Sequence, residues 1–167
     1  MLQTHRKLIV TVVLAAASQC AVAQKPLAPP PQIPYGLSIS TESAKRVAAA
    51  SIAEAKKNKW NMAIAIVDTG GYLVYFEKMQ DTQTGSVDLA IEKARTSALF
   101  RRPTKVFQDA VAAGGDGLRV LRLTGTIPNE GGVPIIVKGM VIGAVGVSGG
   151  SVEQDGHVAN AGAEALR

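Results

Sequence analysis

His157 has the most distinctive chemistry in this 167-residue chain, which contains only two histidines. It falls in an expected C-terminal helix beginning at Ser151, with Glu153 four residues earlier on the same face. One interpretation is a surface histidine paired with Glu153. The other is a metal ligand, because neutral imidazole binds metals readily. In either case the buried stripe of this helix is expected at Gln154, Val158, Ala161 and Ala165.

Several common kinds of site do not fit the sequence. It contains no Gly-x-Gly-x-x-Gly motif and no Gly-Lys-Ser/Thr loop that would bind phosphates. A zinc site needs three or four His, Cys or carboxylate ligands, and the sole cysteine, Cys20, lies close to the N-terminus. A Ser-His-acid triad would have to use His157, and we do not expect one. A carboxylate site for iron or calcium stays open, from acidic residues whose spacing matches no known loop: Asp68, Asp81, Asp88, Glu92, Glu130 and Asp155.

Four cations lie on or just after a helix expected over residues 86–100: Lys93, Arg95, Arg101 and Arg102. They are either a solvated helix end favoured by the helix dipole, or partners for the carboxylates of an acidic ligand. A further set of three residues could act as acid–base catalysts on a small organic acid if burial shifted their pKa values: Glu92, Lys93 and Glu130.

The first 36 residues are expected to lie outside the folded domain. A basic start, an apolar run over residues 8–17 and Ala21-Val22-Ala23 have the order of a secretory signal peptide, residues 1–23. The apolar run is too short for a membrane span. A proline-rich leader follows over residues 24–36. The sequence therefore predicts a periplasmic or secreted protein. Its net charge of +5, which falls when the basic start is removed, does not indicate a nucleic-acid partner.

Residues 37–167 are expected to form one α+β domain. Ser40 caps an amphipathic first helix, a hairpin covers residues 61–78, and Pro103 separates the helix over 86–100 from a short helix over 104–112. Ser151 and Gln154 form a capping box for the last helix. The order α-β-β-α-α-β-β-α predicts helices on an antiparallel sheet of about five strands, built from two hairpins and residues 118–123.

The second hairpin is the centre of the expected fold. Two apolar runs, residues 133–137 and 140–147, flank a Lys138-Gly139 turn. The second run contains Gly143 and Gly146. Glycine within a strand indicates close backbone approach, a bulge or room for a neighbouring element.

The residues of this hairpin and of the helix after it carry a family resemblance. Gly131-Gly-Val-Pro-Ile, Gly139-Met-Val-Ile-Gly-Ala-Val-Gly-Val-Ser-Gly-Gly150, Gln154-Asp155 and Ala159-x-Ala161-Gly162 resemble the GlcG/HbpS family. A related domain follows the adenosyltransferase in PduO-type proteins. The resemblance runs from about Leu37 to the C-terminus and implies a profilin-like arrangement of the elements.

This resemblance implies a protein that binds haem or another tetrapyrrole for uptake, storage or sensing, and we favour a binding protein over an enzyme. His157 would be the axial ligand of the haem iron, because iron in haem accepts neutral imidazole. Met79 and Met140 are the candidates for a second ligand, and Tyr72 or Tyr75 could also bind the iron. Residues that would face the haem propionates are Lys93, Arg95 and Arg101.

Two other functions stay open. One is an accessory enzyme that acts on a small organic acid, and it requires Glu92, Lys93 and Glu130 to converge in a closed pocket. The other is a structural module whose glycine-lined hairpin is buried between subunits. Small side chains and an aromatic content of only 4% make a modest core and predict a homo-oligomer.

Overall fold

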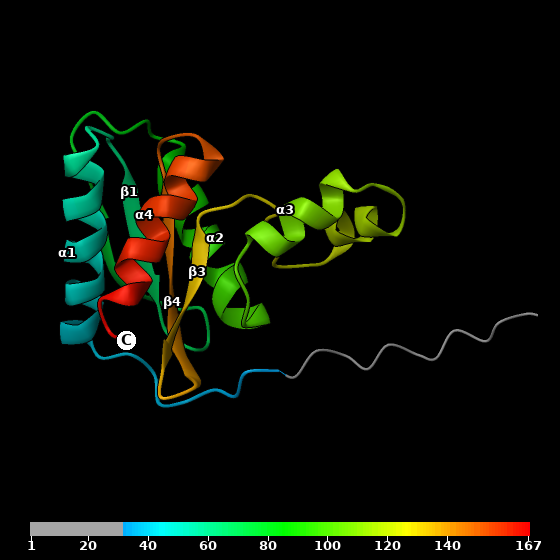
Figure 1. Ribbon diagram of the computed structural model, residues 1–167, viewed down its shortest axis with the longest axis horizontal. Helices are drawn as coiled ribbons and strands as arrows, with labels where there is room; N and C mark the ends of the chain where they lie inside the picture. Colours follow the sequence, from blue (N-terminus) through cyan, green and yellow to red (C-terminus); the bar gives the residue numbers. More distant parts are fainter. Residues whose placement is uncertain (1–31) are drawn as a thin grey trace, which may run out of the picture. The chain divides into compact units, whose positions relative to one another are not determined.

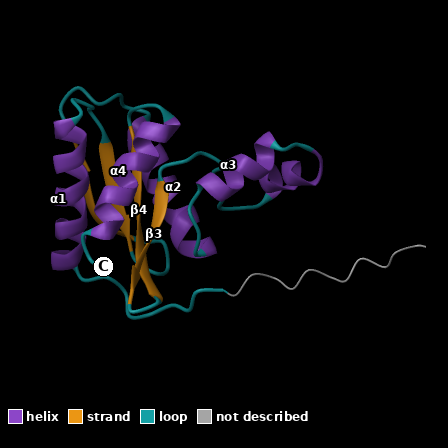
Figure 2. Ribbon diagram, viewed as in Figure 1, coloured by secondary structure: helices purple, strands orange, loops and turns teal. Residues whose placement is uncertain are grey.

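The computed structural model describes residues 32–167, so the expected signal peptide and most of the leader lie outside the described residues. The described residues form one unit. Figures 1 and 2 show its elements, which are α1 Thr41–Lys57, β1 Ala63–Val67, β2 Leu73–Lys78, α2 Ser86–Phe100, α3 Lys105–Ala112, the 3₁₀ helix η1 Gly115–Arg122, β3 Gly132–Val137, β4 Met140–Ser148 and α4 Val152–Glu164. None of the helices within this range is long and apolar enough to cross a membrane.

Helix α1 begins where the sequence predicts. The hydroxyl of Ser40 accepts a hydrogen bond from the backbone N–H of Ser43 and so satisfies one of the N–H groups that a helix start leaves unpaired. Glu42 in the first turn and Lys56 in the last turn have the charges that the helix dipole favours.

The two predicted hairpins are present and join into one antiparallel sheet. Its strand order is β2-β1-β4-β3, so each hairpin contributes one central strand and one edge strand. In the first turn, the carboxylate of Asp68 accepts hydrogen bonds from the N–H groups of Gly70 and Tyr72. In the second, Lys138 and Gly139 both have positive φ, as the tight hairpin turn requires.

Alternation along the central strands sorts large and small side chains onto opposite faces of the sheet. Helices α1 and α4 cover the face that carries Ile64, Ile66, Val145 and Val147, and α2 covers a face of alanines and Val67 (Figure 1). Gly146 lies on the α2 face, where a side chain would overlap the α2 backbone. Of the alternatives for glycine in this strand, room for a neighbouring element is confirmed at Gly146, and that element is α2.

The predicted fifth strand is wrong. Residues 118–123 lie almost entirely in η1, and the sheet formed by the described residues has four strands. Leu118 and Leu121 are three residues apart, which is a helical spacing, and Leu121 is 61% exposed. A short apolar run was insufficient to distinguish a strand from a helix here.

The capping box at the start of α4 is confirmed, but the buried side of the helix is rotated from the expected stripe, of which only Val158 is buried. Ser151 Oγ accepts from the N–H of Gln154, while the Gln154 side chain accepts from the N–H of Ser151. The buried positions are Asp155, Gly156, Val158, Ala159, Gly162 and Ala163. Gly162 accounts for this rotation, because a Cβ there would overlap the Ser51 hydroxyl, so α4 packs on α1 through this residue.

The end of the leader is attached to the domain. The hydroxyl of Tyr35 donates to the carbonyls of Ala98 and Leu99, at 2.8 and 3.0 Å. The guanidinium of Arg101 lies 5.0 Å from the centre of the Tyr35 ring and donates to the carbonyl of Ile33. Arg101 therefore anchors the leader at the end of α2.

Replacing Tyr35 with phenylalanine is expected to lower the free energy of unfolding by about 0.5–1.5 kcal/mol, because the carbonyls at the end of α2 lose their hydroxyl donor. Urea denaturation followed by the fluorescence of the single tryptophan measures this change. Tyr72→Phe is the matched control, since its side chain is 73% exposed and its hydroxyl makes no hydrogen bond within residues 32–167. Equal effects of the two variants would contradict the anchoring role.

Candidate functional site

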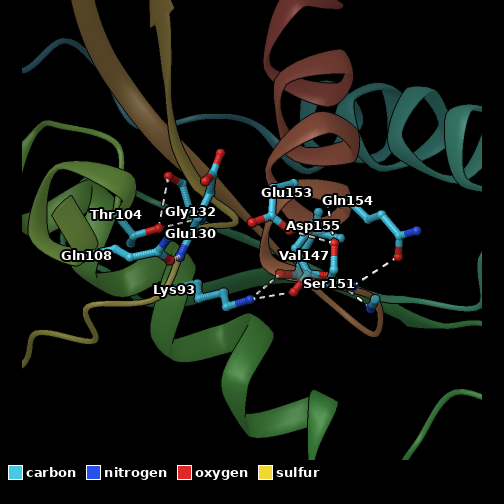
Figure 3. A network of polar contacts seen from close by, with 11 residues as sticks. Lys93, Thr104, Gln108, Glu130, Gly132, Val147, Ser151, Glu153, Gln154 and Asp155 are labelled. Atoms are coloured by element: carbon cyan, nitrogen blue, oxygen red, sulfur yellow. Dashed lines mark hydrogen bonds and ion pairs between the residues drawn. The ribbon is translucent and has the colours of Figure 1, made fainter. Parts of the chain in front are cut away.

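A buried ion pair connects α2 to α4. Lys93 is 1% exposed, and its ammonium lies 2.6 Å from Asp155 Oδ2 and 3.1 Å from the carbonyl oxygen of Val147. Figure 3 shows the Lys93 side chain reaching from α2 to the first turn of α4. The other Asp155 oxygen accepts from the N–H of Gly150. This network therefore ties α2, the end of β4 and α4 together.

Glycine at position 131 makes room for this pair. A Cβ at Gly131 would lie 2.9 Å from Asp155 Cβ and 3.0 Å from Lys93 Nζ, and its φ of +124° also favours glycine. Burial raises the pKa of the Asp155 carboxyl, and the hydrogen bond from Lys93 opposes this shift.

The expectation that Lys93 lies at a solvated helix end is wrong. The buried positions of α2 include Ala90, Ala94 and Ser97 as well as Lys93. Lysine is typical of exposed positions, whereas the spacing of Lys93 from Ala90 and Ser97 places it on the buried side of the helix. That spacing is the signal that would have identified Lys93 as buried.

Glu130 lies beside this network but not in a common pocket with Glu92. Its backbone N–H donates to the Gln108 side chain at 2.8 Å, and its carboxylate packs against Gly156, where a Cβ would overlap it. Burial raises the pKa of the Glu130 carboxyl. Glu92 is exposed on α2 and lines a different pocket. The arrangement that the organic-acid enzyme requires, convergence of Glu92, Lys93 and Glu130, is therefore not formed by these residues.

His157 is exposed, as expected, but its partner is Glu54 of α1. The side chain is 56% exposed, and Nε2 lies 2.8 Å from Glu54 Oε1. The predicted pairing with Glu153 is wrong, because that carboxylate accepts from the Ser151 hydroxyl. The hydrogen bond with His157 is the main cause that lowers the pKa of Glu54. A partner on another helix cannot be identified from spacing along one helix.

Trp60, which the sequence analysis did not single out, lies edge-on to His157 with 6.1 Å between ring centres. It lines an open pocket of about 370 Å³, and a neighbouring pocket of about 570 Å³ shares Asn61 and Asp81 with it. We call the residues of both pockets the Trp60 surface: Lys56, Lys59, Trp60, Asn61, Glu77, Lys78, Met79, Gln80, Asp81, Gln83, Gly149, Gly150 and Gln154. Its residues come from the end of α1, from the segments that follow α1 and β2, and from the start of α4. Figure 1 shows that α1 ends and α4 begins at the same end of the sheet.

The structure brings some of the predicted site residues together and separates others. Met79 lies on the Trp60 surface, and Trp60 of the same surface contacts His157. Arg95 lines the same pocket as Glu92, and Arg101 anchors the leader. The hydroxyl of Tyr75 donates to Glu77 at 3.0 Å. The Trp60 surface therefore draws its cations from three residues outside the predicted set: Lys56, Lys59 and Lys78.

Residues 146–150 read Gly-Val-Ser-Gly-Gly and match the Gly-x-Ser-x-Gly pattern between a strand and a helix, with Ser148 at the central position. Ser148 is only 3% exposed, and the contacts of residues 32–167 include no hydrogen bond between Ser148 and His157. The same residues contain no group of three His, Cys, Asp or Glu side chains placed to hold a metal ion.

Comparison with known proteins places this fold among relatives. The family model described as haem degrading protein HbpS-like matches residues 39–164. Protein GlcG of Escherichia coli K12 is 41% identical over 110 residues, which cover 66% of this chain and 81% of GlcG.

Two crystal structures have the same fold. That of protein ORFY from Klebsiella pneumoniae has a TM-score of 0.72 and 30% identity, covering 84% of this chain and 97% of ORFY. That of a PduOC–haem complex has a TM-score of 0.70 and 27% identity, covering 78% of this chain and 96% of PduOC. With a family model matched over most of its length, the chain belongs to the HbpS-like family.

Proposed function

We propose that this protein binds haem at the Trp60 surface, with His157 beside it as the axial ligand. The observation that carries the proposal is the similarity of this chain, over 78% of its length, to PduOC, whose structure is that of a complex with haem. An exposed imidazole next to an aromatic ring and an open, lysine-lined pocket suits such a ligand.

The donor set at this surface fits a haem. The Glu54 carboxylate, whose pKa is lowered, is ionised at neutral pH and can only accept, so His157 Nε2 carries the hydrogen of their bond. The lone pair of the neutral ring is then on Nδ1, which makes no hydrogen bond to another residue in the 32–167 range. Nε2 could bind iron instead only if water replaced its bond to Glu54 and the ring proton moved to Nδ1. Carboxylate-bound histidines are common metal ligands.

The remaining groups of the surface suit the rest of an amphiphilic anion. Lys59 lines the Trp60 pocket, while Lys56 and Lys78 line its neighbour, so ammonium groups are available for two propionates. The Trp60 ring supplies apolar area for a porphyrin edge. Haem, when bound, would supply an iron centre with an open coordination position for a small ligand.

Titrating the purified chain with haemin and following the Soret band tests this proposal. The wild-type protein is expected to give a saturable shift at one haem per chain, and His157→Ala is expected to weaken binding by about tenfold or more and to change the band position. Asn160→Ala, three residues further along the exposed face of α4, is the control and is expected to behave like wild type. A wild-type chain without a saturable shift would refute haem binding. A His157→Ala titration that matches wild type would refute His157 as the axial ligand.

Export and self-association are further proposals. The order of basic, apolar and small residues over 1–23 supports export to the periplasm or medium. N-terminal sequencing of the mature protein should find a start near Gln24, and an intact Met1 would refute cleavage.

Several large apolar side chains are exposed on the α3–η1 segment, including Val106, Leu118 and Leu121, which supports a homo-oligomer. Light scattering that gives the monomer mass would refute it.

A further inference from the structure

A second pocket, separate from the Trp60 surface, lies between α2 and the segment over residues 125–127. Its volume is about 310 Å³, and its lining residues are Glu92, Arg95, Thr96, Gly125, Thr126 and Ile127. This is at the small end of the volumes that hold organic ligands, so it suits a small molecule rather than a porphyrin.

Thr96 holds the wall of this pocket in place. It is 1% exposed, and its hydroxyl donates to the carbonyl of Gly125 at 3.1 Å and accepts from the N–H of Ile127 at 3.0 Å. The segment is thus attached to α2 by both a donor and an acceptor. The pocket is a formed feature of the fold.

The two charges in the pocket are not neutralised by the protein. Glu92 and Arg95 are three residues apart on α2, so they lie on one face, and neither forms an ion pair within residues 32–167. The stem of Arg95 packs against Gly71 in the first hairpin turn, where a Cβ would lie 3.6 Å from Arg95 Cγ. The stem of Arg95 is therefore held by packing against the hairpin turn, and its guanidinium is available to the pocket.

We propose that this pocket binds a zwitterionic α-amino acid with an uncharged side chain. A simple anion would meet the Glu92 carboxylate, and a simple cation would meet the Arg95 guanidinium, so either would gain from one group and lose at the other. An α-amino acid has both charges, on an ammonium group and a carboxylate group that are attached to the same carbon atom. Its carboxylate pairs with Arg95, which offers a fork of donors, and its ammonium pairs with Glu92. Ile127 contributes an apolar surface for the side chain.

Calorimetric titration with L-leucine and L-alanine tests the proposal, with leucinamide and N-acetyl-leucine as analogues that each lack one charge. Saturable binding of an amino acid is expected, with each analogue about tenfold weaker or worse. Arg95→Gln should weaken leucine binding by about tenfold and abolish the preference over leucinamide. Glu92→Gln should abolish the preference over N-acetyl-leucine. Shifts of the backbone amide signals of Gly125, Thr126 and Ile127 in a ¹⁵N NMR spectrum locate the ligand.

The control is a second charge pair at the same helical spacing, Glu164 and Arg167, which contact each other at the C-terminus. Replacing both with glutamine should leave amino-acid binding unchanged. The proposal would be overturned if neither amino acid bound saturably. It would also be overturned if N-acetyl-leucine bound as tightly as leucine, or if Arg95→Gln bound leucine as tightly as wild type. Haemin titration of the Glu92→Gln and Arg95→Gln variants should match wild type, so failure at this pocket and failure of haem binding are distinguishable.

Discussion

Lys93→Met is expected to lower the free energy of unfolding by about 3–5 kcal/mol, one of the largest single-residue effects in this protein. The substitution leaves Asp155 buried with only backbone donors such as Gly150 N–H for its carboxylate. Removing one member of a buried pair leaves the other charge without a partner in a medium that solvates it poorly. Urea unfolding followed by Trp60 fluorescence measures the loss.

Two comparisons show whether the pair is responsible. Lys105→Met removes the lysine of an exposed pair with Asp109 and should have a much smaller effect. The double variant Lys93→Met with Asp155→Asn should lose less stability than the sum of the two single variants, because the second substitution removes the stranded charge. Additive losses would show that Lys93 and Asp155 are not coupled.

The loss should also depend on pH. Burial raises the pKa of Asp155 above its unfolded value, and without Lys93 the pKa rises further, since the Lys93 hydrogen bond is the main opposing cause. A carboxyl with a raised pKa binds its proton more tightly in the folded state, so stability falls as pH rises through the interval between the two pKa values. The difference between wild type and Lys93→Met should therefore be smaller near pH 4 than near pH 8. A difference that is constant with pH would contradict this assignment.

Gly146→Ala is expected to destabilise the protein by about 2–3 kcal/mol. The new Cβ would overlap the carbonyl oxygen of Ala90 and crowd the backbone nitrogen of Ala94, so α2 would have to move away from β4. Backbone atoms in a helix cannot rotate aside as the end of a side chain can.

Gly85→Ala is the matched control for this substitution. No atom lies within 4 Å of a Cβ at Gly85, and its φ of −61° suits alanine, so the variant should be neutral or slightly more stable. Equal stability of Gly146→Ala and Gly85→Ala would show that α2 does not pack on β4 through this glycine.

Much of the fold follows from local signals in the sequence. The Ser40 and Ser151 caps, the Lys138-Gly139 turn and the order of helices and hairpins all depend on residues close together in the chain. Gly146 is an intermediate case: a glycine in a strand predicts a close neighbour, but which helix it is depends on how the strands pair.

The site was less predictable, because its contacts join distant parts of the chain. Lys93 pairs with Asp155, 62 residues away, and His157 with Glu54, 103 residues away. Spacing along one helix indicates neither partner. Trp60 is adjacent to His157 only because α1 and α4 pack side by side, which again depends on the tertiary fold.

The most direct test of haem binding at the Trp60 surface is a ¹⁵N NMR spectrum of the labelled chain with and without haemin. Ferric haem is paramagnetic and broadens the signals of protons close to it. We predict that the amide of His157 and the indole N–H of Trp60 broaden most, together with the amides of Gly149 and Gly150, while those of Gly125, Thr126 and Ile127 stay sharp. Broadening centred on residues 125–127, with an unaffected Trp60 signal, would contradict this location of the haem.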